Sequence, residues 1–380
     1  MIYLDNAATT WPKPPGVEKA IVETLREKGA NPGRGGHRMS LAAGRVVYQA
    51  RELLARLFGV RDPSRICFTL NCTEALNLAL KGLLKPGDHV LTSSMEHNSM
   101  IRPLKALAKS GVEYTVVPCS ARGELDPDDL EKGILPNTRL IALTHASNVT
   151  GTLLPIAEAG KIAREHGLVF LVDAAQTAGI FPIDVEELNI DLLAFPGHKG
   201  LYGPPGTGGL YIREGLSLAP LKHGGTGSYS ESEEQPEIMP DMYESGTVNT
   251  IGIAGLGAGV SFVLQEGLEQ IRSREEQLLE RLREGLAGVP GIKIYGPAGG
   301  PQAPTLAVNL GSADSGEVAF LLDRIYQIAV RAGLHCAALA HRTLGTTRQG
   351  VVRFSLSYFN TEEEIEAAVR AMEELAKDLS

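Results

Sequence analysis

Seven short apolar runs between residues 65 and 212, alternating with helix-like stretches, constrain the fold of this chain more than any other feature. Several of the runs are separated by stretches with the apolar spacing of a helix, such as TEALNLALKGLL and PIAEAGKIAREHG. Continuous apolar strands joined through helices form mainly parallel sheets with both faces covered, so this alternation predicts an α/β fold. The runs are, in chain order, RICFTL, HVLTSS, YTVVPC, RLIALTHA, LVFLVDAA, DLLAFP and GGLYI.

Polar residues stand at or just after the ends of these runs, which is where an open α/β sheet binds its ligands. Because the carboxyl ends of parallel strands share one edge of the sheet, these side chains are the first candidates for a functional site. They are Asn71, Thr73, His97, Asn148, Asp173, Gln176, His198 and Lys199.

The rest of the chain predicts a long surface loop and then a second domain. Residues 222–250 are rich in Gly, Ser, Glu and Pro, which indicates a surface excursion. A long amphipathic helix, interrupted by glycines, is predicted over residues 251–283 and beyond. The alternation in VVRFSLSYF predicts a strand with Arg353 on its polar face, and the spacing of Thr361 and Glu364 predicts a capped helix after it.

Composition excludes several classes of partner. The 380 residues carry a net charge of −9, whereas a nucleic-acid binder needs a basic stripe, so we expect no nucleic-acid partner. No apolar run has the length of a membrane span, and MIYLDNAATT has neither the basic nor the apolar region of a secretory leader. Cys67, Cys72, Cys119 and Cys336 lack C-x-x-C spacing, so we expect no metal site and no disulfide framework, and we expect a cytoplasmic protein.

Two strand ends carry the most informative pair of side chains. LVDAAQTAG ends a strand in Asp173, which needs a cationic or hydrogen-bonded partner if it is buried; a capping carboxylate is the plainer alternative. FPGHKGLYGPPGTGG places Lys199 after the next strand, among glycines; a solvated surface charge is the plainer alternative. Together they suit pyridoxal phosphate, whose aldehyde needs a lysine and whose ring nitrogen needs an acidic partner.

The segment LNCTEALNLAL is a candidate phosphate cradle beside that pair. Asn71 can cap a helix, with Glu74 as its reciprocal partner three residues later. The positive end of the helix then faces the sheet edge, and Thr73 adds a hydroxyl. A plain capped helix is the alternative.

Eight motifs, in this order along the chain, resemble those of NifS/SufS-like cysteine desulfurases, which are class V aminotransferase-type enzymes of fold type I. The motifs are YLDNAATT, TEALN, EHNS, HASNVTG, DAAQ, GHKGLYGP, ESGTVNT and RAGLHCA, and the similarity runs from residue 3 to about residue 360. The resemblance implies a homodimer of subunits with a mainly parallel seven-stranded sheet in a large pyridoxal-phosphate domain and a smaller α+β C-terminal domain. The large domain would span residues 15–255, and the small one residues 1–14 plus 256–380.

The resemblance implies a role for each matching residue around the cofactor. Lys199 would attach the cofactor and then transfer protons, and Asp173 would keep the ring nitrogen protonated. His97 would stack on the ring, and Gln176 would hydrogen-bond its phenolic oxygen.

The remaining site residues would bind the phosphate and the substrate. Thr73 and His198 would bind the phosphate, and Thr247 would reach the phosphate of the neighbouring subunit. Asn148 and Arg353 would hold the substrate carboxylate, for which a guanidinium provides a matching fork of donors.

Cys336 would be the nucleophile that takes the sulfur of L-cysteine as a persulfide and leaves alanine. A sulfur-acceptor protein would then serve iron–sulfur cluster or thio-cofactor synthesis. Only a thiolate is nucleophilic, and His335 and Arg331 are candidates to favour it. The RAGLHC segment resembles the group II branch, which includes selenocysteine lyases. Three alternatives stay open: a selenocysteine lyase, another enzyme of the class V fold, and a non-enzymatic protein with that fold.

Three positions depart from the family pattern. Pro196 stands where the family usually has Ser or Thr, so a hydroxyl and an amide donor for the phosphate are missing. Val248 replaces the usual Pro after Thr247, and an extra Gly200 follows Lys199.

Overall fold

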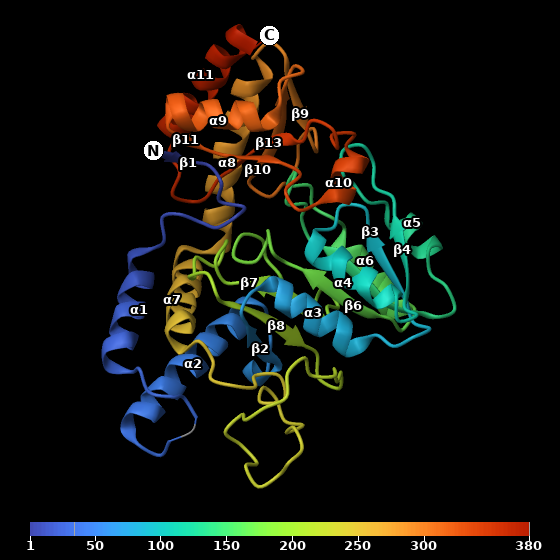
Figure 1. Cartoon of the computed structure of the whole chain (residues 1–380), viewed down its shortest axis with the longest axis vertical. Coiled ribbons are helices and arrows are strands. Elements are labelled where there is room, and N and C mark those ends of the chain that lie inside the picture. Colours follow the sequence, from blue (N-terminus) through green and yellow to red (C-terminus); the bar gives the residue numbers. More distant parts are fainter. Residues whose placement is uncertain (34, 380) are drawn as a thin grey trace.

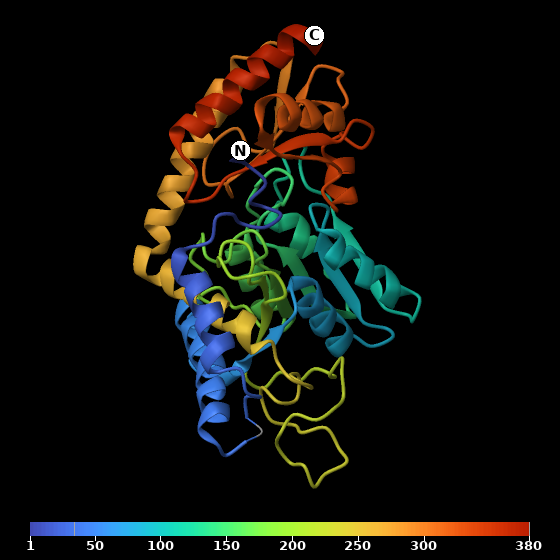
Figure 2. The same cartoon turned by 60° about the vertical axis from the view of Figure 1, so that its left-hand side comes forward.

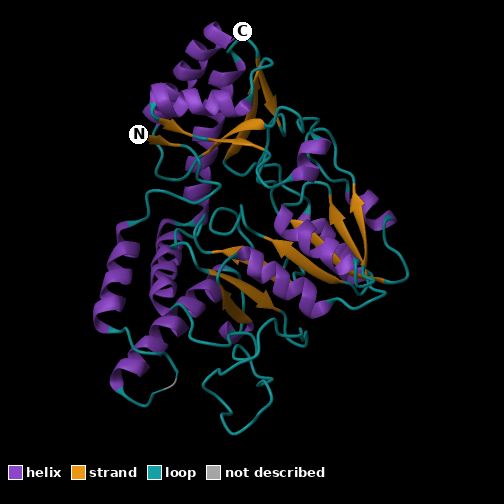
Figure 3. Cartoon of the chain, in the orientation of Figure 1, coloured by secondary structure: helices purple, strands orange, loops and turns teal. Residues whose placement is uncertain are grey.

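The computed structural model describes residues 1–33 and 35–379 as two lobes stacked along the long axis of the molecule (Figure 1). One lobe contains a seven-stranded sheet, and the other contains a four-stranded sheet near both chain termini. Helices pack against both sheets (Figure 3). The α/β fold predicted from the alternating runs is confirmed.

All seven predicted runs form strands of one sheet, in the order β2–β8–β7–β6–β5–β3–β4. Six of these strands point the same way, and β8 is antiparallel to both β2 and β7. The predicted mainly parallel seven-stranded sheet is therefore confirmed. Its strands are β2 (Ile66–Thr69), β3 (His89–Ser93), β4 (Glu113–Val117), β5 (Thr138–Thr144), β6 (Val169–Asp173), β7 (Leu192–Pro196) and β8 (Gly208–Ile212).

Helices cover both faces of this sheet. Successive side chains of a strand point to opposite faces, so a strand that is apolar throughout needs a covering layer on each face. In β6, Phe170 and Val172 join the apolar cluster shared with α2, α6 and α7, whereas Val169 and Leu171 join the cluster shared with α3 and α4. All five residues of β6 are buried, and the first four form a continuous apolar run that ends at Asp173. The helices of this lobe are α1 (Pro15–Glu27), α2 (Arg38–Leu57), η1 (Pro63–Arg65), α3 (Cys72–Leu83), α4 (Asn98–Ala108), α5 (Pro127–Lys132), α6 (Ile156–Glu165) and α7 (Thr250–Glu266).

The second lobe contains an antiparallel sheet of order β12–β13–β10–β9. As predicted, Phe354 in β13 packs into the apolar cluster of this lobe while Arg353 lines a pocket. The predicted capping box is also confirmed, since Thr361 Oγ1 accepts from Glu364 N at 3.3 Å and Glu364 Oε2 accepts from Thr361 N at 3.1 Å. The elements are α8 (Leu268–Ala287), β9 (Ile292–Tyr295), β10 (Thr305–Leu310), α9 (Ser315–Tyr326), β12 (Arg331–Gly333), α10 (Ala338–Thr343), β13 (Val351–Ser355) and α11 (Glu362–Leu379).

The start of the chain also lies in the second lobe, where β1 (Ile2–Tyr3) pairs in parallel with β11 (Ile328–Ala329). Leu4 belongs to the same apolar cluster as β13. The domain limits of residues 15–255 and of residues 1–14 with 256–380 stay a prediction.

The single long helix predicted over residues 251–283 and beyond is wrong. The chain forms α7 and α8, which meet at an angle of 84°. Gly267 lies between them with φ of 87°, a conformation that residues with a Cβ rarely adopt. From this bend α8 runs to the second lobe (Figure 2).

Within residues 1–33 and 35–379, no single helix combines the length and apolarity needed to cross a membrane; only the bent pair α7 and α8 meets that test when its members are joined.

Residues 222–249 contain neither helix nor strand and project from the end of the first lobe, as Figure 2 shows. The predicted surface excursion is confirmed, but its C-terminal part is anchored. Glu244 forms a buried ion pair with Arg51 at 2.8 Å. The Tyr243 hydroxyl donates to the Leu218 carbonyl at 3.1 Å.

Candidate active site

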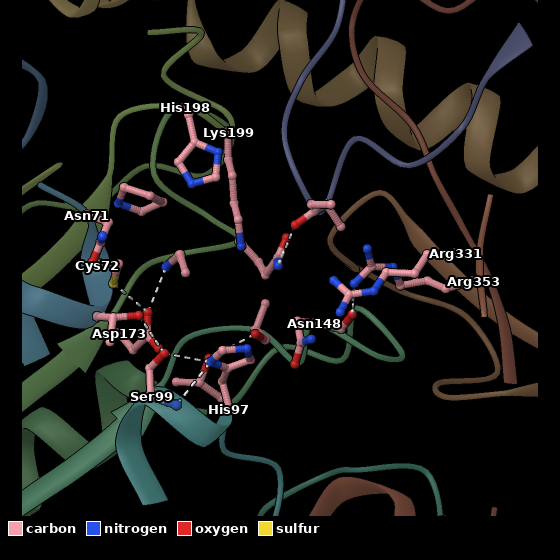
Figure 4. Close-up of a pocket in the computed structure, with 18 residues that line it drawn as sticks. Asn71, Cys72, His97, Ser99, Asn148, Asp173, His198, Lys199, Arg331 and Arg353 are labelled. Carbon is pink, nitrogen blue, oxygen red and sulfur yellow. Dashed lines mark hydrogen bonds between the residues drawn. The ribbon is translucent and has the colours of Figure 1, made fainter. Parts of the chain in front are cut away.

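The eight polar residues predicted at the strand ends all line one pocket of about 230 Å³ at the carboxyl edge of the seven-stranded sheet (Figure 4). The second lobe contributes Arg331 and Arg353 to the same pocket, and the N-terminal segment contributes Ala7 and Ala8. Residues from distant parts of the chain therefore converge where the fold predicts a ligand.

Asp173 ends β6 and is almost fully buried, with 2% of its surface exposed. Its Oδ1 accepts hydrogen bonds from the Ala175 N–H at 2.9 Å and from the Cys72 thiol at 3.3 Å. Burial raises the pKa of Asp173, while these two bonds and the Lys199 charge oppose the rise. The desolvation of this carboxylate is therefore only partly offset by its neighbours. A cationic group of a ligand placed against it would stabilise its charged form.

Lys199 lies two residues beyond Gly197, after β7, and its side chain points into the pocket (Figure 4). Enclosure by protein lowers the pKa of Lys199 to about 8, with the Arg353 charge as a second cause and the Asp173 charge opposing it. A substantial share of the amine is therefore unprotonated just above neutral pH, and this form is nucleophilic.

The backbone around Lys199 is fixed by contact between the loops after β6 and β7. A Cβ on Gly200 would lie 2.5 Å from the Ala178 carbonyl oxygen, and a Cβ on Gly179 would overlap the Gly200 carbonyl. The extra glycine after Lys199 is therefore required by this packing.

His97 caps α4, and its Nδ1 accepts from the Ser99 N–H at 3.1 Å. The ring proton therefore belongs on Nε2. Burial, followed by the positive charge of Lys199, lowers the pKa of His97 to about 4, so the ring is neutral at neutral pH. A neutral ring lining the pocket fits the predicted stacking on a cofactor.

The amino end of α3 opens into the pocket, as the phosphate cradle requires. Asn71 Oδ1 accepts from the Glu74 N–H at 2.9 Å, so the predicted cap forms. The reciprocal bond differs, because Glu74 Oε2 accepts from the Leu70 N–H at 2.6 Å instead of the Asn71 N–H. Thr73 Oγ1 is exposed beside this end and lies 2.8 Å from Ser99 Oγ.

Three side-chain atoms of pocket residues are buried and have no hydrogen-bond partner among the described residues: Asn148 Oδ1, His198 Nδ1 and Arg353 Nε. Because buried polar atoms are nearly always paired, these three indicate a polar ligand. Pro196, which also lines the pocket, adds neither a hydroxyl nor an N–H.

Arg353 reaches the pocket from β13 and is 1% exposed. Its guanidinium donates to the Asn148 carbonyl at 2.9 Å and pairs with Asp5 at 2.7 Å. Asn148 Nδ2 in turn donates to the His335 carbonyl at 2.8 Å. These contacts hold the two predicted carboxylate-binding residues together.

Cys336 is exposed and lies beside the pocket, although it is not among the lining residues. Its carbonyl accepts from the Asn98 N–H at 2.7 Å, next to His97. Of the two candidate neighbours, Arg331 is the one that contacts the sulfur, since its Nη2 lies 3.7 Å from Cys336 Sγ. The alternative candidate, His335, is buried and contacts the Arg331 carbonyl instead.

Thr247 does not line the pocket of its own chain. It is exposed, and its Oγ1 accepts from Asn31 Nδ2 at 3.2 Å. Gln176 does line the pocket, and its Nε2 donates to the Ala7 carbonyl at 3.2 Å.

Sequence reasoning missed several neighbours of the predicted residues. Ser99 joins His97 to Thr73, Asp5 pairs with Arg353, and Cys72 contacts Asp173. The sequence signal for Ser99 and Cys72 was proximity to a predicted residue, in the EHNS segment and in residues 71–73, and Asp5 lies in the YLDNAATT motif. In the described residues, no three His, Cys, Asp or Glu side chains are grouped so that they could hold a metal ion.

The family model of class V aminotransferases matches residues 2–368 of the chain. A probable cysteine desulfurase of Methanothermobacter thermautotrophicus is 38% identical over 384 residues, which cover 99% of this chain and 94% of that protein. A cysteine desulfurase of Escherichia coli O157:H7 is 36% identical over 388 residues, with 99% and 93% covered.

Solved structures show the same similarity. The apo structure of a cysteine desulfurase from Thermococcus onnurineus superimposes with a TM-score of 0.93 at 36% identity, covering 100% of this chain and 95% of that one. A cysteine desulfurase from Escherichia coli superimposes with a TM-score of 0.89 at 32% identity, covering 99% and 94%.

Proposed function

This chain belongs to the class V aminotransferase family and is a cysteine desulfurase, and we propose that it uses pyridoxal phosphate held by Lys199 and accepts sulfur on Cys336. The observation that supports this proposal best is the single pocket that collects Lys199, Asp173, His97 and Arg353. Each of these side chains provides a property that the reaction needs.

The pocket fits pyridoxal phosphate by its donor set. Asp173 would pair with the ring nitrogen, His97 would lie against the ring, and Gln176 would bond its phenolic oxygen. His198, whose Nδ1 is buried without a partner, and Thr73 at the amino end of α3 would hold the phosphate. When bound, this cofactor supplies an aldehyde that binds amino acids covalently and a ring that accepts the electron pair of Cα.

Substrate binding and proton transfer fall to residues of this chain. Arg353 and Asn148, each with an unpartnered buried atom, would bind the substrate carboxylate. Lys199, whose pKa is lowered to about 8, would take the Cα proton once its amine is free and later return a proton to the product.

Cys336 would perform the sulfur transfer. Its thiolate, with the Arg331 Nη2 3.7 Å from the sulfur, attacks the sulfur of the bound cysteine. A bond forms between the two sulfur atoms, and the bond from the substrate sulfur to Cβ breaks with its electron pair left on the carbon skeleton. Protonation of that skeleton gives alanine, and Cys336 retains the persulfide.

The exposure of Cys336 suits delivery of this sulfur to another protein, so we include a sulfur-acceptor protein in the proposal. Iron–sulfur cluster or thio-cofactor synthesis would use the sulfur. A homodimer, in which Thr247 reaches the neighbouring phosphate, and a cytoplasmic location complete the proposal.

Mass spectrometry of the intact protein with pyridoxal phosphate, after brief exposure to L-cysteine, tests the role of Cys336. We expect a gain of one sulfur atom together with alanine, lost in Cys336→Ser but retained in the control Cys119→Ser, whose thiol is only partly buried and does not line the pocket. Equal persulfide on Cys336→Ser would refute the assignment.

A second candidate, selenocysteine lyase, would use the same residues. Comparison of kcat/KM for L-cysteine and L-selenocysteine decides between them, because that ratio defines discrimination. Alanine formed from selenocysteine at the same rate by wild type and Cys336→Ser would favour the lyase.

A further inference from the structure

Cys72 is the first residue of α3, next to the Asn71 cap, and it lines the pocket while only 8% exposed. Its Sγ lies 3.3 Å from Asp173 Oδ1. A dashed line marks this hydrogen bond in Figure 4. No other described side chain donates a hydrogen bond to this carboxylate; the second donor is the backbone N–H of Ala175.

The thiol of Cys72 can act only as a neutral donor in this position. Burial raises its pKa well above the ordinary range, and the charge of Asp173 raises it further. The sulfur therefore keeps its proton at neutral pH, and a protonated thiol beside a carboxylate donates to it. A nucleophilic role, which needs a thiolate, does not fit.

Cys67 provides an internal comparison. It is also buried, and its Sγ lies 3.4 Å from the Leu210 carbonyl, a neutral acceptor in the neighbouring strand. It does not line the pocket. The two thiols share burial and hydrogen bonding, but only Cys72 contacts a charged pocket residue.

We propose that Cys72 is a positioning residue whose S–H holds the Asp173 carboxylate ionised and oriented toward the ring nitrogen of the cofactor. This inference rests on the proposed function. With Oδ1 engaged by Cys72 and Ala175, the carboxylate plane is fixed by two donors from different elements.

The groups around Asp173 decide in which direction its pKa shifts when the Cys72 thiol is removed. The titratable groups that act on the pKa of Asp173 are Cys72 from α3 and Lys199 after β7. Two others lie near it: Glu96 after β3, whose pKa the Asp173 charge raises, and His97, which lines the same pocket. Only a hydrogen bond to the charged form, or the Lys199 charge, favours ionised Asp173. Removing the thiol therefore shifts Asp173 toward its protonated form, which cannot pair with a protonated nitrogen.

Binding of pyridoxal phosphate to the full chain after removal of its cofactor tests the inference. The measurement is equilibrium dialysis between pH 5 and 8. For Cys72→Ala we expect a dissociation constant about three- to tenfold higher at pH 7. The loss of affinity at low pH should also begin at a higher pH than in wild type, because Asp173 protonates earlier. Cys72→Ser, which keeps a donor, should stay within about twofold of wild type.

The control Cys67→Ala removes a buried thiol of equal size without touching Asp173, and should leave both readouts unchanged. Wild-type affinity and pH dependence in Cys72→Ala would overturn the inference. So would a Cys72→Ser variant as impaired as Cys72→Ala, since that result makes packing the cause. If the wild type itself binds no pyridoxal phosphate, the proposed function fails together with this inference.

Discussion

At the scale of single residues, the site depends on buried polar groups whose protonation is set by enclosure. Lys199 and His97 have lowered pKa values, and Asp173 has a raised one, each with burial as the largest cause. Burial favours the neutral form of each group. Of the three, Lys199, whose pKa is lowered to about 8, is the group that can exchange a proton near neutral pH.

Glu275 in α8 is a buried titratable group like those of the pocket, but it has no role in the proposed reaction. Its side chain is 2% exposed, and Oε2 has no hydrogen-bond partner among the described residues. Burial raises the pKa of Glu275 to about 8, although a hydrogen bond with the Tyr358 backbone opposes the rise. This carboxyl is therefore neutral in the folded protein at neutral pH.

Glu275→Gln should make the protein more stable at alkaline pH. Between the ordinary carboxyl pKa and about 8, the folded chain keeps a proton that the unfolded chain releases, so the free energy of unfolding of the wild type falls as pH rises through this window. An amide cannot ionise and avoids this loss. We expect near-equal stability at about pH 5 and a gain of roughly 2 kcal/mol or more at about pH 8.5, measured by urea unfolding.

The control for this prediction is Glu280→Gln, also on α8, whose side chain is 58% exposed. Its stability difference from wild type should stay small and change little with pH. A wild-type unfolding free energy that is constant across the same window would contradict the assignment of a buried neutral acid to Glu275.

The sequence pattern alone predicted site residues mainly where they follow a strand, whereas Cys336 and Thr247 were identified through the resemblance to a family. The position of Asp173 at the end of an apolar run fixes where its side chain goes once the sheet forms. Its donor Cys72 lies 101 residues away, and Asp5 lies 348 residues from Arg353. No local pattern encodes such contacts, because they arise from the packing of separate elements.

At the scale of secondary-structure elements, continuous apolar runs were sufficient to predict all seven strands. The failure at residues 251–283 has a physical reason. Apolar periodicity continues through Gly267, but its backbone conformation turns the chain by 84° between α7 and α8. Many other glycines in the same stretch, such as Gly255 and Gly259, stay inside α7, so the sequence alone did not distinguish the bend.

Gly267→Ala should therefore destabilise the protein through its backbone. A Cβ at this position would have no heavy atom within 4 Å, so the cost comes from φ of 87° and not from a steric clash. We expect a loss of about 1–3 kcal/mol in the free energy of unfolding, measured by urea denaturation. Gly16→Ala, in α1 with equally open space and no positive φ, should be neutral or slightly stabilising. Equal effects of the two substitutions would show that the bend does not need glycine.

At the scale of the whole molecule, the pocket lies between the two lobes and draws on both of them. β13 delivers Arg353 and β12 delivers Arg331, while the large sheet delivers Asp173 and Lys199. Relative movement of the lobes would change the distance between the proposed substrate-binding and cofactor-binding groups. The ion pair from Asp5 to Arg353 links the N-terminal segment to this arrangement.

Thr247 provides the test of the proposed homodimer, because its exposed hydroxyl lies outside the pocket of its own chain. If Thr247 binds the phosphate of the neighbouring subunit, Thr247→Ala should weaken pyridoxal phosphate binding by about tenfold, as expected for a lost hydrogen bond to a charged group.

A second variant, Lys199→Ala, should abolish covalent attachment of the cofactor. Refolded mixtures of the two variants should contain hybrid dimers in which one site has both an intact Lys199 and an intact Thr247 from its neighbour. The titration of such mixtures with pyridoxal phosphate should therefore show a fraction of sites with wild-type affinity that is present in neither variant alone. Thr247→Val, which removes the hydroxyl but keeps the shape, should behave as Thr247→Ala. If the mixtures titrate as the simple sum of the two variants while sedimentation shows dimers, Thr247 does not act across the interface.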